Sequence, residues 1–478
     1  MSLSVALQVA QSALSTRQKE TAVLSRNITN ATQEGYTRKT ALVSTLHSSD
    51  GSGGGVYISS ISRATDQALF SSLVSSTSVG ERSEAYLDGL TQLSATIGDT
   101  DQDISPAAVL GELESALQAY GAMPSDSVLA GQVLTAAQNM ASTLNDASSA
   151  VQAEREAADA EIAQSVETIN EQLAIIEELN DEIVRGTELG SDVTDAMDAR
   201  DQAVLALSAE IGIKTQTREN NDLIITTESG VMMFETTARS VTFEQTDTYS
   251  ASTIGNSVRV DGVPVAGPDS RMEISNGRIA GLVAVRDEAA VTYQNQLDEM
   301  ARGLITAFQE SGNAGIFSYS GGPAIPASGT LVSGLAADIE VNSAIDTDHL
   351  DLIRDGITVD YNPDDYASYG DRIQDLLGNL DQSMTFDLET GVDTTATLSD
   401  FAASSVSWLE AARQNANNTA ENQSITLNRV TESFSNATGV NIDEEMQSML
   451  EIERSYTATA KLISTIDEML DQLLEIAG

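Results

Sequence analysis

The sequence predicts a mainly α-helical protein with a small β insert, built as an elongated rod of long helices. Three observations predict this fold class. Apolar residues recur at helical spacing over most of the chain, and the longest such pattern runs from 126 to 185. Aromatic residues make up only 4% of the 478 residues, which favours narrow aliphatic cores between helices. The period changes to strand-like alternation between 211 and 278, and both ends of the chain carry long apolar seams.

Charge and cysteine content exclude several classes of protein. The chain has 72 acidic and 24 basic residues, a formal net charge of −48. Because phosphate groups are bound by clustered Lys and Arg, this charge excludes nucleic acid as a partner. The chain has no cysteine, and therefore no disulfide, thiolate ligand or cysteine nucleophile. No run reaches the ~20 apolar residues of a membrane span, and the N-terminus lacks the pattern of a cleavable signal peptide, so we expect no membrane insertion.

The first helix is predicted over residues 3–30. Its apolar seam steps by four and three residues, which is the heptad spacing of a coiled coil. Ser2 is a candidate N-cap, and the helix is expected to end before Gly35, in a segment that suits turns. A helix with so narrow a stripe is poorly stable alone and needs a partner. The seam consists of Leu3, Leu7, Ala10, Leu14, Arg17, Thr21, Leu24 and Ile28.

The elements after this helix are predicted from changes in the spacing of apolar residues. Residues 40–62 predict an extended hairpin with the glycine-rich tip GSGGG, which lacks the lysine and following helix of a phosphate-binding loop. At 1.5 Å per residue, a continuous helix over 126–185 would span about 90 Å, although its Ser/Ala-rich middle leaves two shorter helices as an alternative. Further helices are expected over 64–98, 192–210, 279–310 and 366–434, strands over 211–243, 258–265 and 271–274, and irregular structure over 312–365.

This order predicts three domains. The two ends, 1–62 and 435–478, would pair as a terminal axial domain. Residues 63–210 and 279–434 would form a helical rod domain, and 211–278 a β-rich insert domain.

The last predicted helix, over residues 441–476, carries two adjacent apolar rows. Asn441 is a good N-cap, and neither Gly nor Pro interrupts the pattern. A single seam suits one partner helix, so two rows predict packing against several helices, one of them the first helix of the chain. The residues expected at these contacts are Asn441, Met446, Met449, Ile452, Tyr456, Leu462, Ile463, Ile466, Met469, Leu470 and Leu473.

Motifs at the two ends resemble the paired signatures of the bacterial flagellar axial proteins, which comprise rod, hook and hook-associated proteins. The N-terminal motif is NITNATQEGYTR, and the C-terminal motif combines GVNIDEEM with AKLISTIDEMLDQLL. The helical middle resembles that of hook-associated members, with Asp198, Arg200 and Asp201 in a D-x-R-D position. The resemblance is weakest over 244–270 and 312–400. The N-terminal residues to which it assigns assembly are Leu3, Leu7, Ala10, Leu14, Leu24, Asn27, Ile28, Asn30, Gly35, Tyr36 and Arg38.

The resemblance implies a structural, non-enzymatic part of the flagellum that joins hook to filament. It implies a ring of copies of the chain whose end helices line the inner tube. The implied partners are other copies, the hook protein, hook-associated protein 3, an export chaperone on the C-terminal region and the type III export apparatus. No cofactor is implied. The implied location is extracellular, reached unfolded and without a cleavable signal. The alternatives are another axial protein, such as hook-associated protein 3 or a hook or rod protein, an exported enzyme, or a coiled-coil adhesin.

Three groups of acidic residues have spacings that also occur in metal or catalytic sites. Asp99, Asp101 and Asp103 have the spacing of a calcium loop but lack its Gly and Glu, which favours a solvated turn. Asp198 and Asp201 flank Arg200, and their i and i+3 spacing favours local ion pairs over a catalytic pair. A surface loop rather than a metal site is favoured for the last group, Asp346, Asp348, His349 and Asp351.

Overall fold

The computed structural model describes residues 3–47, 53–97 and 105–477, and the chain divides into two compact units. Unit 1 comprises Met1–Val79, Thr168–Ser240 and Ser424–Gly478, and unit 2 comprises the remainder. The predicted class, mainly α-helical with small antiparallel sheets, is confirmed. The division between the units falls between Ser240 and Val241, inside the predicted β insert. The three predicted domains, namely the terminal axial, helical rod and β-rich insert domains, stay a prediction. The helices that contribute to both units are α2 (Gln67–Ile97), α4 (Ser127–Leu189) and α11 (Leu398–Thr438).

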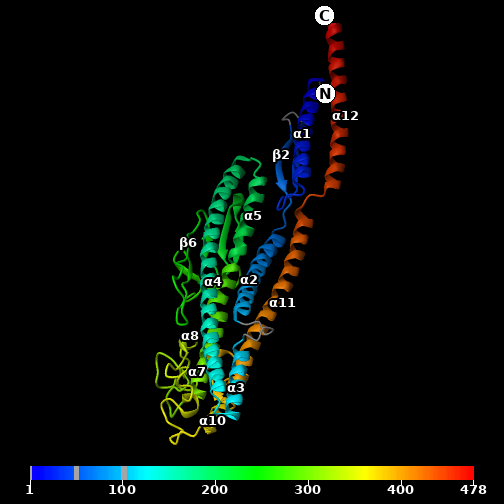
Figure 1. Cartoon of the computed structure of the whole chain (residues 1–478). Coiled ribbons are helices and arrows are strands. Elements are labelled where there is room, and N and C mark those ends of the chain that lie inside the picture. The colour runs from blue at the N-terminus through cyan, green and yellow to red at the C-terminus, as the bar shows by residue number, and fades with distance from the viewer. Residues whose placement is uncertain (1–2, 48–52, 98–104, 478) are drawn as a thin grey trace. The chain divides into compact units, whose positions relative to one another are not determined.

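Within unit 1, the first and last helices lie side by side in opposite directions (Figure 1). α1 (Leu3–Asn30) begins and ends as predicted, and α12 (Ile442–Ala477) packs along it. Asn441 caps α12, because its Oδ1 accepts from the backbone N–H of Asp443 at 3.0 Å. On another side α1 contacts the hairpin of β1 (Lys39–His47) and β2 (Gly53–Arg63).

The rest of unit 1 is built on the C-terminal part of α4. A three-stranded antiparallel sheet in the order β3-β4-β5 follows α5. The inward side chains of β4 alternate with outward ones, as a strand with one buried face requires. Phe70 of α2 and Phe434 of α11 pack with ring centroids 5.9 Å apart. The elements are α5 (Thr194–Glu210), β3 (Ile213–Thr217), β4 (Leu223–Thr227) and β5 (Met232–Phe234).

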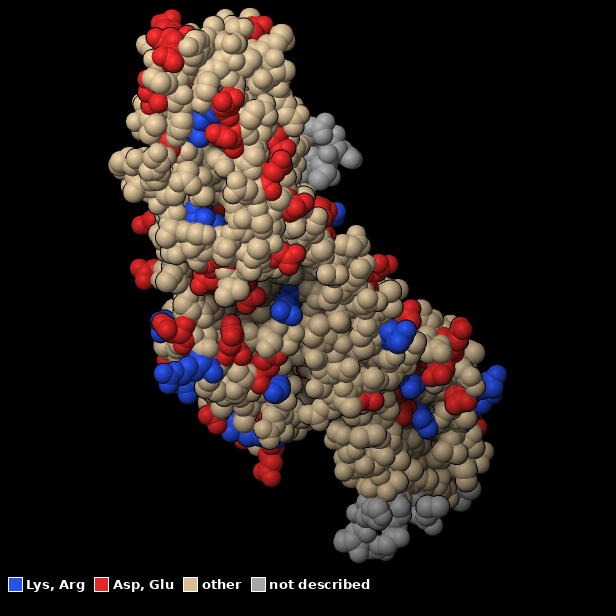
Figure 2. All heavy atoms as spheres, turned by 90° about the horizontal axis from the view of Figure 1, so that it is seen from below, with Lys and Arg blue, Asp and Glu red and all other residues tan. Residues whose placement is uncertain are grey.

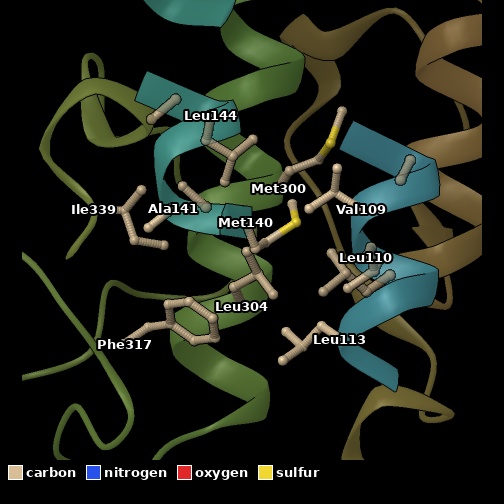
Figure 3. Close-up of a cluster of buried hydrophobic side chains, with 14 of the residues drawn as sticks. Val109, Leu110, Leu113, Met140, Ala141, Leu144, Met300, Leu304, Phe317 and Ile339 are labelled. Carbon is tan, nitrogen blue, oxygen red and sulfur yellow. The ribbon is translucent and has the colours of Figure 1, made fainter. Parts of the chain in front are cut away.

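Unit 2 contains one large core of buried apolar side chains between helices (Figure 3). Met140 and Leu144 of α4 face Met300 and Leu304 of α7, and α3 closes the core from a third side. Phe386 and Phe401 add a stacked pair with centroids 3.9 Å apart. Each such buried side chain stabilises the unit by about 1.5–3 kcal/mol relative to an exposed one.

The long helix α4 is continuous over its 63 residues, about 95 Å at 1.5 Å per residue. Its Ser/Ala-rich middle does not break it, because Ala has the highest helix propensity and small residues let neighbouring helices approach. α3 was not predicted as a separate helix, yet its start is well marked. Ser105 Oγ accepts from the backbone N–H of Ala108, and Pro106 occupies the first turn.

The remaining elements of unit 2 surround this core. A second three-stranded sheet, β6-β7-β8, precedes α6, and a π-helical turn (Val285–Ala289) joins α6 to α7. The structure describes residues 271–274, and they do not form the predicted strand. The Ile274 N–H donates a single backbone hydrogen bond to the Val265 carbonyl, and the residues on either side form turns and bends. The predicted helix over 366–434 is interrupted between 381 and 397. The elements are α3 (Pro106–Ala122), β6 (Val241–Thr242), β7 (Val258–Val260), β8 (Val263–Ala266), α6 (Arg278–Ala284), α7 (Ala290–Ala307), β9 (Phe317–Ser318), α8 (Leu335–Asp338), β10 (Glu340–Val341), α9 (Leu352–Asp355), α10 (Asp371–Leu380), β11 (Met384–Thr385) and β12 (Thr395–Ala396).

The surface reflects the acidic composition. Figure 2 shows Asp and Glu side chains spread over the face that it draws, with smaller groups of Lys and Arg between them. Among the described residues, no helix is both long enough and apolar enough to cross a membrane. The calcium-like spacing of Asp99, Asp101 and Asp103 lies outside the described residues.

Candidate assembly site

Asn27, near the end of α1, is the hub at which the two ends of the chain meet. Its side chain is fully buried and all of its hydrogen-bonding capacity is used. Nδ2 donates to the Lys39 carbonyl and to Glu445 Oε2, both at 2.9 Å. Oδ1 accepts from the Lys39 N–H at 3.0 Å and from the Tyr36 hydroxyl at 2.9 Å. Asn27 therefore closes the turn that follows α1 and holds the first turn of α12.

Arg38 makes the second link between the two motifs. Its backbone N–H donates to the Thr438 carbonyl at 2.8 Å, where α11 ends. Its Nε donates to Glu445 Oε1 at 2.6 Å, and the Glu445 side chain is fully buried. Glu445 thus accepts from both Asn27 and Arg38 across more than 400 residues of sequence. Two motifs from opposite ends of the chain form one hydrogen-bonded site.

Gly35 is required where the turn approaches α5. Its φ is +72°, in the left-handed region that favours glycine. A Cβ at this position would lie 1.3 Å from Nε2 of Gln202, which donates to the Glu34 carbonyl at 3.1 Å. Any larger residue would displace Gln202 and strain the turn.

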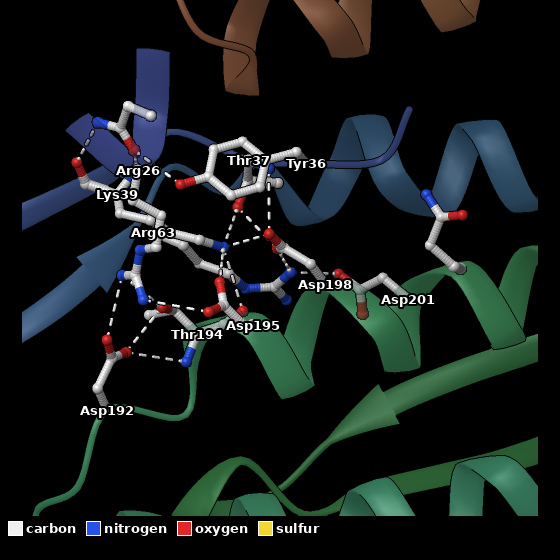
Figure 4. Close-up of polar contacts among 12 residues, drawn as sticks. Arg26, Tyr36, Thr37, Lys39, Arg63, Asp192, Thr194, Asp195, Asp198 and Asp201 are labelled. Atoms are coloured by element: carbon white, nitrogen blue, oxygen red, sulfur yellow. Dashed lines mark hydrogen bonds and ion pairs between the residues drawn. The ribbon is translucent and has the colours of Figure 1, made fainter. Parts of the chain in front are cut away.

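The D-x-R-D segment of α5 receives the residues that follow this turn (Figure 4). Asp198 accepts from the Thr37 N–H at 3.1 Å and from the Thr37 hydroxyl at 2.7 Å. Arg63, at the end of β2, pairs with Asp198 at 2.9 Å and with Asp201 at 2.7 Å. The ammonium of Lys39, whose side chain is fully buried, also pairs with Asp198. The hairpin is thereby fixed to α5 at both of its ends.

This arrangement corrects the prediction of local ion pairs within α5. Asp198 and Asp201 pair with Lys39 and Arg63 of the hairpin, not with Arg200. Arg200 instead donates to Asn180 Oδ1 and to the Asn221 carbonyl, both at 2.7 Å. A local pair would have left the hairpin cations buried without counter-ions, which costs several kcal/mol.

Burial dominates the electrostatics of the site. It lowers the pKa of Lys39 below the usual value, and the neighbouring Asp198 carboxylate only partly offsets this effect. Burial also raises the pKa of Tyr36 to about 12 and lowers that of Arg200 to about 10. For Arg63, burial acts against the charged form, but Asp201 and Asp198 outweigh it and raise the pKa. These groups act as fixed structural contacts.

A more exposed pair of contacts lies beside this site. Arg26 donates to Asp192 and to Asp195, each at 3.1 Å. Burial opposes ionisation of Asp192, but hydrogen bonds from Thr194 and Arg26 lower its pKa overall. These contacts line a cavity of about 950 Å³ between α1, β2 and the start of α5. Of the four basic residues that line it, Arg26 and Arg63 are already engaged by aspartates of the same unit, and the other two are Lys19 and Arg200.

The predicted assembly residues of α1 lie on its covered side. Ala10 and Asn27 are buried, and Tyr36 and Arg38 are half-buried. Gly35 is exposed at the turn. The half-buried residues of the predicted seam and its end are Leu3, Leu7, Leu14, Leu24, Ile28 and Asn30.

The predicted residues of α12 divide into a covered row and exposed flanks. Ile466 is buried, and Met449, Ile452, Ile463 and Leu470 are half-buried. On a helical projection of 100° per residue, the exposed apolar residues lie on both sides of this covered row. Ile442, Met446 and Leu450 lie on one flank and Leu462, Met469 and Leu473 on the other, while the exposed Tyr456 and Leu474 project onto the row itself.

Sequence reasoning missed Thr37, Lys39, Arg63 and the contact role of Glu445. One signal was available, since Arg38 and Lys39 are adjacent bases in an otherwise weakly charged segment. Asp346 and His349 form an exposed contact of 2.8 Å, and the described residues contain no group of three His, Cys, Asp or Glu side chains placed to hold a metal.

Comparison with known proteins gives a consistent result. The family model "Flagellar hook-associated protein FlgK helical domain" matches residues 90–323, and "Flagellar basal body rod FlgEFG protein C-terminal" matches 431–476. Flagellar hook-associated protein 1 of Bacillus subtilis is 23% identical over 99% of this chain and 98% of its own length. The protein of that name from Salmonella typhimurium is 23% identical over 63% of this chain and 54% of its own length.

A solved structure shares the fold. The flagellar hook junction protein FlgK from Burkholderia pseudomallei aligns with a TM-score of 0.58 at 13% identity, over 76% of this chain and 98% of that one. These matches place the similarity of this chain among the flagellar axial proteins. Within that class, its matches are to the FlgK hook-associated proteins.

Proposed function

We propose that this chain is a structural component of the bacterial flagellum that joins hook to filament, and that it assembles through its terminal helices. One observation carries the proposal: Asn27 and Arg38 hold Glu445, so the two ends form a single unit whose α12 still exposes apolar flanks. Exposed apolar rows of this length favour further helix partners. The full-length match to hook-associated protein 1 of Bacillus subtilis supports the same role.

The partners follow from this role. Other copies of the chain would cover the flanks of α12, and the hook protein and hook-associated protein 3 would contact the ring that the copies form. An export chaperone would cover the apolar face of α12 before the type III apparatus exports the chain, because a solvent-exposed face of this kind promotes aggregation. The role requires no catalysis, and the relatives are structural flagellar proteins.

A deletion strain tests the proposed function. Loss of the gene should leave hooks without filaments and flagellin in the medium, and the full chain should restore filaments. A chain that ends at residue 440 should not restore them, although unit 2 would remain folded. Normal filaments in the deletion strain would contradict the junction role.

Limited proteolysis of the dilute monomer tests how assembly occurs. We propose that residues 1–40 and 440–478 complete their folding only on incorporation, since a helix with half its apolar surface exposed gains stability from partners. We expect the protease to cleave both ends rapidly. We also expect the helical circular dichroism of the dilute monomer to be weaker than a chain with both terminal helices folded would give. Resistant and fully helical ends in the monomer would contradict this mechanism but not the junction role.

A further inference from the structure

The outward surface of the β1–β2 hairpin is apolar and uncharged. Leu42 and Leu46 of β1 and Tyr57 of β2, which pairs with Ser44, share one face and are each 44–47% exposed. Asp50 is the only charged residue between 40 and 62, in a chain of which 20% is charged. A surface strand of a highly acidic protein normally carries charges that discourage pairing. This hairpin therefore has the composition of a contact surface.

α1 covers the opposite side of the hairpin. The Val56 N–H donates to Ser12 Oγ at 3.2 Å, and the Val56 carbonyl accepts from Thr16 Oγ1 at 3.1 Å. Both backbone groups point away from β1, so α1 satisfies the free edge of β2. α1 in turn packs on α12, and Figure 1 shows α1 between β2 and α12. In this order, α1 contacts both strands of the hairpin but leaves Leu42, Leu46 and Tyr57 exposed.

One flank of α12 is uncovered at the other end of this order. Leu462, Met469 and Leu473 are 49–53% exposed. Ile466, which lies between them in sequence, is buried, so this flank continues directly from the covered row. The residues that run along this side of α12 at spacings of three and four carry no charge. They are Ser455, Ala458, Leu462, Thr465, Met469 and Leu473.

Charge decides which surfaces two copies can share. Each copy carries a net charge of −48, so a contact between copies must exclude acidic side chains or pair them. The hairpin surface and the α12 flank both lack such side chains. Residues 441–478 contain two basic and nine acidic residues, net −7, so the α12 helices of two copies repel each other and the flank favours the uncharged hairpin over a second α12.

We propose that the hairpin surface formed by Leu42, Leu46 and Tyr57 receives the Leu462–Met469–Leu473 flank of α12 from a second copy. The proposal rests on the proposed function, because it names the surface that α12 contacts during assembly. The two patches differ and lie at opposite ends of the order hairpin, α1, α12. The contact is therefore heterologous, and repetition of it generates a closed ring or a tube rather than a dimer.

The absence of cysteine from the chain permits a direct test. Two differently tagged copies, one with a cysteine on the hairpin and one with a cysteine on the flank, are expressed together in a strain that lacks the native gene. The pairs combine Leu42→Cys, Leu46→Cys or Tyr57→Cys with Leu462→Cys, Met469→Cys or Leu473→Cys. Isolated flagella are then oxidised. We expect disulfide-linked dimers with both tags for at least one pair, since a disulfide requires Cβ atoms about 4 Å apart.

Leu388→Cys is the matched control, because Leu388 is 83% exposed but lies in unit 2. Paired with Met469→Cys, it should give no dimer above the background of single variants. Dimers with Leu388→Cys as abundant as those with the hairpin, or swimming cells with the tagged chains in their flagella and no mixed dimer from any pair, would overturn the proposal. Absence of the tagged chains from flagella, together with normal filaments, would instead overturn the proposed function.

A second variant measures the energetic role of the surface. Leu42→Asp should lower incorporation into flagella by about tenfold or more, because docking would bury an unpaired carboxylate. Leu388→Asp should leave incorporation unchanged. The thermal transition of each purified chain, followed by circular dichroism, should match the parent. Normal incorporation of the Leu42→Asp chain would contradict the docking of this surface.

Discussion

Unit 2 holds its helices with a closed apolar core, whereas unit 1 holds the terminal helices with buried polar contacts and leaves part of α12 uncovered. In unit 2, side chains such as Leu304 and Phe401 have no exposure to solvent. In unit 1, a buried hydrogen bond from Asn27 to Glu445 joins the two ends of the chain. Apolar contacts are tolerant of register, whereas hydrogen bonds specify it. The difference indicates that unit 1 is built to fix one arrangement of its ends and to gain stability from further contacts.

The largest effect is expected from Asp198→Ala. The change leaves the buried Lys39 ammonium with only a longer carboxylate contact of 3.8 Å to Asp195 and removes both bonds to Thr37, a loss of about 3–5 kcal/mol in unit 1. Trp408 is the only tryptophan and belongs to unit 2. In urea, helical circular dichroism should therefore begin to fall well before the Trp408 fluorescence changes.

Asp195→Ala provides the matched control on the same helix. The Asp195 side chain is 62% exposed, pairs with Arg26 at 3.1 Å and reaches Lys39 only at 3.8 Å, so its loss should cost less than about 1 kcal/mol. Equal effects of the two substitutions would show that the buried pair does not hold unit 1 together.

These contacts also show what sequence can predict. The bounds of α1, and Asn441 as the cap of α12, follow from heptad spacing and capping chemistry, which are local. α3 could have been found from Ser105 and Pro106. The pairing of Asp198 with Lys39 and Arg63 could not, because many carboxylates in so acidic a chain are equivalent in sequence and only the fold selects one. The motifs marked Asn27 and Arg38 as important without indicating that both bind Glu445.

Gly35→Ala should have the next largest effect, about 1–2 kcal/mol once residues 1–40 have folded, measured as a shift in the amount of chain incorporated into flagella. The left-handed φ and the close approach of Gln202 both act against a Cβ. Gly190 has a similar φ of +70° in the same unit, with no atom within 4 Å of an added Cβ. Gly190→Ala isolates the backbone cost, so an equal shift for both variants would exclude a role for the Gln202 contact.

A pH effect separates unit 2 from unit 1. Burial raises the pKa of Asp298 to about 6, despite hydrogen bonds from the N–H groups of Gly334 and Ala336 and from Gln294. A folded-state pKa above the unfolded value gives stability that is present at low pH and lost as pH rises through about 6. Between pH 5 and 7, the Trp408 transition should lose roughly 1 kcal/mol of unfolding free energy.

Asp298→Asn removes the titration and tests this assignment. The variant is expected to be less stable at pH 5, because an amide offers one acceptor oxygen where the carboxyl offers two. Its unfolding free energy should nevertheless vary less between pH 5 and 7 than that of the parent. An unchanged pH slope would assign the effect to another group, such as Glu154, whose pKa burial raises to about 7.

The smallest effect on the monomer is expected from Met469→Ser, and it separates folding from assembly most sharply. Met469 is 49% exposed, so its replacement should change the unfolding free energy by less than about 0.5 kcal/mol. Ile466, three residues earlier, is 6% exposed and faces the covered side, so Ile466→Ser should cost the α1–α12 pair about 3 kcal/mol once that pair has folded on incorporation. Incorporation into flagella should fall for both variants. A drop for Ile466→Ser alone would mean that the exposed flank of α12 has no partner, and that the stability of the terminal pair, rather than its uncovered surface, limits assembly.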